Sequence, residues 1–410
     1  MIVGTYDVWP FFACVAFLMA LAASPALKFA DAPPNPKGER VSTLDGLRGF
    51  LALSVFFCHG MVYHGVISRN IWEIPPSNFY TVLGQAGVAI FFMITGYLFW
   101  SMMIKDGGKP RWLKLYIGRV FRIGPLYLFA VFVLFLIVFS ITGWTLHEPG
   151  WEVTKEISQW MMLGFFGYGR SINSFQHTGW ILAGVTWTLK YEWLFYFSLL
   201  FTSFAARSKF QCFIFPLVTL IFLLTCMISV TLTQTQSNRC ACVALFSVGM
   251  LSAAIQARAM NLSIPNWLSS VLVISFISSV FIFSDTAYAW FPIILMGLAF
   301  FLIVSGSNVF GLLSNRAARR LGNVSYGIYL LQGLVLLSFF SLGPVRRFAL
   351  ASPEQGWEAL SVCSVLLVLV ATMTHFLIEQ PGIKIGQRLD AAIRARTGKN
   401  ATPSMAPLAP

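Results

Sequence analysis

Residues 44–66 read LDGLRGFLALSVFFCHGMVYHGV, an apolar stretch that charged and polar side chains interrupt at only a few positions. A helix needs about 20 mainly apolar residues to cross the hydrocarbon of a bilayer, and this stretch is long enough. Apolar stretches of similar length recur along almost the whole chain. The sequence therefore predicts an all-α protein that is embedded in a membrane.

The composition of the 410 residues leads to the same conclusion. Hydrophobic residues make up 57% of the chain and charged residues only 10%, and the mean hydropathy is +0.74. Soluble domains carry about 25% charged residues, so lipid must face much of this surface. The seven cysteines lie mostly in apolar stretches, where we interpret them as packing residues. Cys240 and Cys242 lack partners for a zinc site, and we expect no bound metal.

Eleven stretches are predicted to cross the membrane: 8–29, 44–66, 82–104, 122–143, 185–206, 210–233, 240–258, 266–284, 288–306, 324–343 and 358–379. The first could instead be a cleaved secretory signal. However, residues 1–8 contain Asp7 and no Lys or Arg, unlike the basic start of a signal peptide. We therefore predict a polytopic transmembrane helical bundle, with a ten-helix core and one extra N-terminal helix. The predicted parts are residues 1–43 (helix and linker), 44–382 (main domain) and 383–410 (partly disordered tail).

The net charge of +13 follows the predicted loops rather than indicating a nucleic-acid partner. With the N-terminus outside, one side of the membrane holds 21 Lys and Arg residues and the other holds six. Basic loops remain in the cytoplasm, which predicts an extracytoplasmic N-terminus and a cytoplasmic C-terminus. The longest loop, 144–184, is then extracytoplasmic. Its tryptophans suit the membrane interface, so this loop is expected to lie along the surface or to re-enter.

Residues Arg48 and His59 define a polar stripe on one predicted span. They are eleven residues apart, which is close to three helical turns, so they share a face about 16 Å long. Asp45 lies one turn before Arg48 and can pair with it. Ionisable groups inside a bilayer are costly and often functional. The alternative is that Arg48 extends to the interface and His59 only bonds a neighbouring helix.

A second span carries Trp187, Lys190 and Glu192. If residue 185 is the outer end of this span, Glu192 lies at a depth in the membrane comparable with that of His59. A carboxylate that meets a histidine across helices would orient the imidazole as a general base. A purely structural hydrogen bond between helices is the alternative interpretation.

Arg119 and Arg122 lie one turn apart, at the end of a stretch that contains six basic residues between 105 and 122. Paired guanidinium groups are well suited to binding phosphates. The alternatives are a basic loop that only sets topology, or binding of lipid phosphates.

Taken in order, these motifs resemble the membrane-bound acyltransferase-3 family. The matching positions are Asp45-Gly46-Leu47-Arg48 with His59, Gly87-Val88 with Phe91-Phe92 and Gly96-Tyr97, Arg119 with Arg122, Trp187/Leu189/Glu192 with Phe195-Tyr196, Ser325-Tyr326 with Tyr329-Leu330, and Glu379 with Pro381. Each motif alone is weak, but their order across residues 44–382 is specific. Gln332 departs from the pattern, because many members have a histidine there, and we expect no catalytic role for it.

The resemblance implies transfer of an acyl group, usually acetyl, from acetyl-CoA to a hydroxyl of a sugar or glycolipid such as lipopolysaccharide. It implies a bacterial inner-membrane enzyme with the acyl-CoA on the cytoplasmic side and membrane lipids around it. His59, Glu192, Arg48 and Asp45 are then the catalytic candidates, and Arg119, Arg122 and Arg48 the candidates for CoA. Candidates for substrate contacts are Lys190, Trp187 and Tyr326.

Two other classes of function remain open from the sequence. A transporter or flippase could use the polar stripe as a substrate path, although such proteins often show internal repeats or paired broken helices, and neither is apparent. A scaffold subunit of a glycan-assembly complex would keep its function without His59. Hydrolysis of acetyl-CoA by the purified protein distinguishes the enzyme from the flippase.

Overall fold

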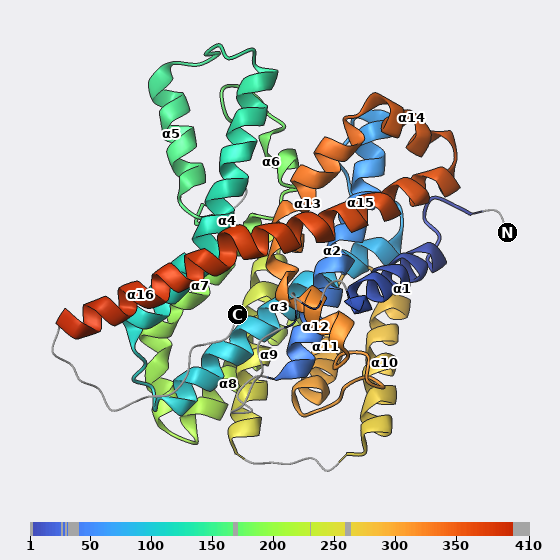
Figure 1. Cartoon of the computed structure of the whole chain (residues 1–410). Helices are drawn as coiled ribbons and strands as arrows, with labels where there is room; N and C mark the ends of the chain where they lie inside the picture. The colour runs from blue at the N-terminus through green and yellow to red at the C-terminus, as the bar shows by residue number, and fades with distance from the viewer. Residues whose placement is uncertain are drawn as a thin grey trace.

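The computed structural model describes residues 3–25, 28, 31, 41–166, 171–229, 231–258 and 264–396. Within these ranges the chain forms a helical bundle without a β-strand (Figure 1). A single isolated bridge joins Ile172 and Phe175. The all-α fold class predicted from the sequence is confirmed.

The first half of the bundle contains seven α-helices: α1 (Trp9–Ala23), α2 (Ser42–Arg69), α3 (Asn78–Lys105), α4 (Trp112–Ile141), α5 (Gly150–Met161), α6 (Thr178–Ile181) and α7 (Trp187–Thr202). The second half contains α8 (Gln211–Ser229), α9 (Gln234–Ala257), α10 (Asn266–Phe283), α11 (Trp290–Val304), α12 (Arg316–Asn323), α13 (Ser325–Phe340), α14 (Gly343–Ala351), α15 (Pro353–Thr374) and α16 (Gln380–Arg396). A 3-10 turn, Ser203–Arg207, follows α7, and a π-helical turn, His375–Glu379, joins α15 to α16.

Seven helical units in the described ranges are long and apolar enough to cross a membrane: α2, α3, α4, α8, α9, α10 and the continuous unit Pro353–Arg396. The pair α12–α13, bent by 64°, would be an eighth. The sequence predicted eleven spans, and the difference lies mainly in short helices. The helices α1, α7 and α11 contain only 15, 16 and 15 residues, below the roughly 20 that a span needs.

The shortness of α7 has a visible cause in the segment before it. Residues 171–186 enter the bundle as turns, and most of them are buried. A Cβ added to Gly333, in the middle of α13, would overlap the backbone of Leu182 and Ala183. Irregular backbone at this depth is tolerated only where protein surrounds it. The last part of the long loop therefore lies inside the bundle, while α5 stands beside α4 at its edge (Figure 1).

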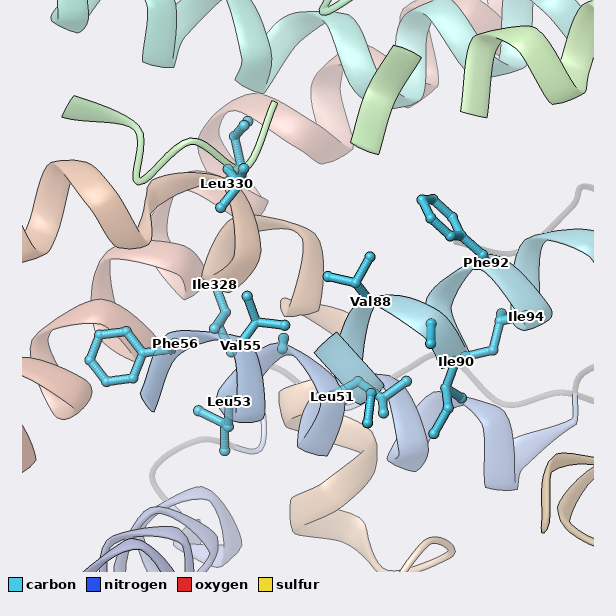
Figure 2. Packing of buried hydrophobic residues seen from close by; sticks show 14 of the residues in the cluster. Leu51, Leu53, Val55, Phe56, Val88, Ile90, Phe92, Ile94, Ile328 and Leu330 are labelled. Carbon is cyan, nitrogen blue, oxygen red and sulfur yellow. The ribbon is translucent and has the colours of Figure 1, made fainter. Parts of the chain in front are cut away.

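Glycines allow several helices to pack closely at the centre of the bundle. A Cβ at Gly96 of α3 would overlap the carbonyl oxygen of Phe246 on α9, and one at Gly249 would overlap that of Met93. Small residues of this kind let helix backbones approach each other in a membrane. Figure 2 shows the apolar side chains of α2, α3 and α13 gathered around this centre.

The loops rich in Lys and Arg lie at one end of the bundle, where α2 and α4 begin and α3 and α9 end. We call this the basic end. Contacts across it join loops that are distant in sequence: Thr43 with Ile303, Lys209 with Arg258, and Arg111 with Asp390. These contacts join chain segments that the sequence places on the same side of the membrane.

Arg320 of α12 fastens the extra N-terminal helix to the core. Its side chain is 3% exposed and donates to the carbonyl oxygens of Ala22 and Ser24 at the end of α1, both at 2.7 Å. A cation suits the unpaired carbonyls at a helix C-terminus. Arg320 Nε also donates to Asp31 at 2.6 Å, and this hydrogen bond lowers the pKa of the Asp31 carboxyl.

The C-terminal part of the chain differs from the predicted tail. Residues 383–396 belong to α16, which continues from α15 and crosses α4 (Figure 1). Glycines make this crossing close, since a Cβ at Gly386 would lie 2.7 Å from the Phe121 side chain. The run predicted to be disordered, 401–410, and most of the predicted linker, 32–40, lie outside the described residues.

Candidate active site

A cavity of about 550 Å³ opens between α2, α3, α4, α7, α13 and α16. Along α3 it extends from Val88 to Met102, fourteen residues, or about 21 Å of helix. Small-molecule sites typically measure about 300–1,000 Å³. The cavity is therefore large enough for an elongated ligand, and its α16 side lies at the basic end.

Positive side chains outnumber negative ones in the charged lining of this cavity. Its cationic residues are Arg48, Lys114, Arg119, Arg122 and Arg394, whereas its carboxylates are Glu192 and Asp390. Three of the residues that the sequence singled out for the donor, Arg48, Arg119 and Arg122, thus come together. An excess of cations in a cleft raises the local concentration of an anionic ligand.

Arg122 is held by a buried network at the junction of α15 and α16. Its Nη1 donates to Glu379 Oε2 at 3.1 Å, and the two side chains are 11% and 0% exposed. His375 Nδ1 lies 3.4 Å from the same oxygen, and the guanidinium of Arg122 lies 5.8 Å from the centre of the Tyr326 ring. The π-helical turn places His375 and Glu379 on this side, and such turns are frequent at functional sites.

Glu192 lies deeper in the cavity than the rim and faces the other two arginines. It accepts a hydrogen bond from Tyr196 at 2.8 Å. Arg119 and Arg48 are close enough to act on it electrostatically. The guanidinium of Arg119 also lies 5.0 Å from the centre of the Phe99 ring. Glu192 is therefore part of the cation-lined wall.

Hydroxyl groups from α7 and α13 line the inner part of the cavity. Thr188 Oγ1 and the Tyr329 hydroxyl are 3.0 Å apart, and the Tyr326 hydroxyl donates to the carbonyl of Ile123 at 2.9 Å. Ser325 is 1% exposed, and its Oγ has no hydrogen-bond partner among the described residues. A buried hydroxyl without a partner is costly, so a polar ligand atom would be stabilised beside Ser325.

His59 does not line this cavity but lies one layer beyond it. Its Nδ1 is 2.9 Å from the carbonyl oxygen of Val55. Gln332 lies beside the imidazole ring, and its Nε2 donates to the carbonyl of Tyr329 at 2.7 Å. Gln332 is fully buried, and its Oε1 has no partner among the described residues. Gln332 thus contacts both His59 and the backbone of Tyr329, whose hydroxyl belongs to the hydroxyl layer of the cavity.

The pairing expected between His59 and Glu192 is not formed in the structure. The depth of Glu192 was counted from residue 185 as the outer end of a span, but the chain has already entered the bundle before α7 begins at Trp187. Glu192 consequently lies on the level of Arg48, whereas His59 lies nearer the opposite end of α2. The continuous α2 does place Arg48 and His59 on one helix, as expected.

On the side away from the cavity, His59 faces aromatic rings from two loops. The centre of its ring lies 6.2 Å from that of Trp72, which stacks on Trp180 at 5.7 Å. The centre of the His177 ring lies 3.9 Å from the centre of the Trp180 ring. The sequence analysis missed Trp72, because only the re-entry of residues 171–186 brings the two tryptophans together.

Three other candidate residues lie outside the cavity. Lys190 is exposed on the surface of α7. Trp187 packs against Phe92 and Tyr191 within the aromatic core. Asp45 is buried at the start of α2, where its backbone closely contacts Gly322 of α12. Tyr326, by contrast, is part of the cavity wall.

Within the described ranges, no group of three or more His, Cys, Asp and Glu side chains is arranged to hold a metal ion. The cavity also includes residues that the sequence analysis did not assign to the site, although Tyr196 and Tyr329 belong to the matching motifs: Lys114, Thr188, Tyr196, Tyr329, Gln387, Asp390 and Arg394. The spacing Gly382-x-x-x-Gly386 could have pointed to Gln387, Asp390 and Arg394, because it indicates that this stretch packs closely on another helix.

Comparison with known proteins identifies the family of the chain. The acyltransferase-3 family, described as an acyltransferase domain, matches residues 41–376. Acyltransferase MdmB of Streptomyces mycarofaciens is 30% identical over 165 residues, which are 39% of this chain and 38% of that protein. The match thus spans about two fifths of that relative's length. No solved structure matches the chain. Because the family match covers most of its length, the chain belongs to the acyltransferase-3 family.

Proposed function

We propose that the protein is an integral membrane O-acyltransferase. It moves an acyl group, with acetyl as the first candidate, from acyl-CoA to a hydroxyl of a surface glycan or glycolipid. The observation that carries this proposal is the elongated, cation-lined cavity that opens at the basic end of a chain from an acyltransferase family. The basic end faces the cytoplasm of a bacterial inner membrane, where the donor is available.

The donor enters from the basic end with its acyl group foremost. Arg48 and Arg119 bind its phosphates, and the Ser325 hydroxyl bonds a polar atom further along the chain. Arg122 contributes less charge, because Glu379 already pairs with it. The acyl end then reaches Thr188 and Tyr329, the layer next to Gln332 and His59.

His59 provides the base for the transfer. The acceptor oxygen attacks the thioester carbonyl, an ester C–O bond forms, and the C–S bond breaks. The acceptor proton goes to His59 and then to the departing thiolate of CoA. This is the balance of a direct transfer. In a transfer through acyl-His59, an imidazole nitrogen attacks the thioester carbonyl, a C–N bond forms as the C–S bond breaks, and the imidazole proton goes to the thiolate. The acceptor oxygen then attacks the acyl-imidazole, the ester C–O bond forms as the C–N bond breaks, and the acceptor proton goes to His59. Donor alone labels the protein with the acyl group only in the second case.

The acceptor approaches from the opposite end, past Trp72 and Trp180. Their faces offer apolar surface to a sugar ring, next to the half-buried imidazole of His59. Trp187 and Lys190 lie away from both approaches, and we assign them no contact with the donor.

The test compares surface glycans of cells that express the parent with those of cells that express His59→Ala, using mass spectrometry. We expect the acyl mass to disappear while the amount of protein in the membrane stays normal. Arg119→Gln should weaken binding of CoA at least about tenfold, because a charge-assisted hydrogen bond contributes about 1.5–3 kcal/mol. Retained acylation in His59→Ala would contradict the assigned role. A parent protein that neither binds CoA nor releases it from acetyl-CoA would overturn the enzyme in favour of a flippase.

A further inference from the structure

The wall of the cavity at the basic end comes from α16, which lies beyond the residues 41–376 that match the family. Its contribution is substantial: Ile383, Gly386, Gln387, Asp390 and Arg394 all line the cavity. The helix is seated against α4 by glycines, since a Cβ on Gly382 or Gly386 would meet Pro125 or Phe121. The position of this wall is therefore set by close packing.

A cluster of cations surrounds the only carboxylate of this wall. Asp390 is 8% exposed and bonds both Arg111, at 3.0 Å, and Arg394. Lys114 of α4, one turn after Arg111, also lines the cavity and has no ion-pair partner in the part of the chain that the structure describes. Three cations against one carboxylate leave this rim with an excess of two positive charges.

The cations deeper in the cavity have more of their charge compensated. Arg122 is paired with Glu379, and Arg119 and Arg48 face Glu192. A ligand with several phosphate charges would therefore place the most exposed of them at the rim, where the uncompensated positive charge lies. Lys114 and Arg394 can reach such a group from two different helices.

We propose that α16 is part of the donor site, and that Lys114 and Arg394 form a phosphate subsite for the terminal phosphate on the ribose of the acyl-CoA. This inference rests on the proposed function. In this arrangement Asp390 positions the Arg394 guanidinium, and Arg111 holds Asp390 in place. Gln387 forms the wall beside the nucleotide part of the donor.

The experiment measures binding of CoA and of dephospho-CoA, which lacks this phosphate, to the full-length protein in nanodiscs of phosphatidylcholine. The parent should bind CoA at least about tenfold more tightly than dephospho-CoA, since one charge-assisted contact is lost. In the double variant Lys114→Gln/Arg394→Gln this ratio should fall to about one, with the affinity for dephospho-CoA little changed. Lys109→Gln removes an exposed lysine of the loop before α4 that does not line the cavity, and should keep the ratio of the parent.

Each contrary result has a distinct meaning. A double variant that keeps the ratio of the parent overturns the subsite but leaves the proposed function standing. A ratio that falls equally in Lys109→Gln also overturns it, because general attraction by the basic surface would then explain the preference. If the parent shows no preference, and phosphatidylglycerol in the nanodisc stabilises it but not the double variant, the phosphate belongs to lipid and the proposal is wrong.

A second variant tests the wall independently of charge. Gln387 is exposed at the rim, so Gln387→Trp is accommodated without disturbing the core. Its indole should reduce affinity for CoA and dephospho-CoA alike, at least about tenfold, with unchanged thermal unfolding. Unchanged affinity for both ligands would show that α16 does not border the donor.

Discussion

The ion pair between Arg122 and Glu379 should contribute far more to stability than an exposed pair of the same chemistry. Its atoms are 3.1 Å apart, and the side chains are 11% and 0% exposed. At an effective dielectric constant of about 20, unit charges at this distance attract by about 5 kcal/mol before desolvation is subtracted. The substitution Glu379→Gln removes the attraction and leaves the guanidinium buried, so a loss of about 3–5 kcal/mol is expected.

The measurement is thermal unfolding of the protein purified in detergent. The fraction of protein that remains monodisperse after heating is used to monitor unfolding. The chain offers a matched control in Arg69 and Glu73, an ion pair whose side chains are 52% and 45% exposed. Because exposed pairs contribute about 0–1 kcal/mol, Glu73→Gln should unfold close to the parent.

A double variant separates the loss of the attraction from the cost of leaving a buried charge without a partner. Arg122→Met/Glu379→Leu removes both charges and should recover much of the stability that Glu379→Gln loses, because no buried ion remains without a partner. His375 also faces Glu379, at 3.4 Å, so it stays unchanged in every variant. If Glu379→Gln unfolds at the same temperature as Glu73→Gln, the reasoning about burial is refuted.

Three further outcomes are expected. Gly249→Val should prevent normal accumulation of the protein, because any Cβ there overlaps the α3 backbone. Gly118→Ala is the control and should accumulate normally, because no atom lies within 4 Å of a Cβ at that position. Immunoblots of membrane fractions measure the amount of each variant. Trp72→Ala should raise the KM for the acceptor at least several-fold and leave CoA binding unchanged, as steady-state kinetics and titration would reveal. Arg320 lowers the pKa of Asp31, so the stability from this pair is present above pH 4 and lost as the pH falls further. Unfolding midpoints of the parent should therefore drop more than those of Asp31→Asn between pH 5 and pH 3.

Local patterns in the sequence were sufficient for the helical class and for part of the site. The apolar stretches predicted the helices, and the spacing of Arg48, Arg119 and Arg122 selected three residues that the fold brings to one cavity. These predictions succeeded because hydropathy and helical periodicity depend on neighbouring residues alone.

The predictions that failed depended on tertiary structure. The depth of Glu192 was misjudged because nothing in residues 171–186 reveals that they enter the bundle as turns. The sequence placed residues 383–396 in a tail after the last span and did not reveal that this stretch packs on α4, where a Cβ at Gly386 would meet Phe121. Trp72 lies in a short loop, and its partner is more than a hundred residues away.

The re-entry of residues 171–186 makes the protein modular. This segment and the loop at 70–77 supply the stacked tryptophans, and neither supplies a residue to the donor cavity. If the proposed function holds, a graft of these two loops from a relative is expected to change which hydroxyl is acylated without changing the donor. Such a graft has one fixed requirement, a glycine at position 333, because the backbone at Ala183 leaves no room for a side chain there.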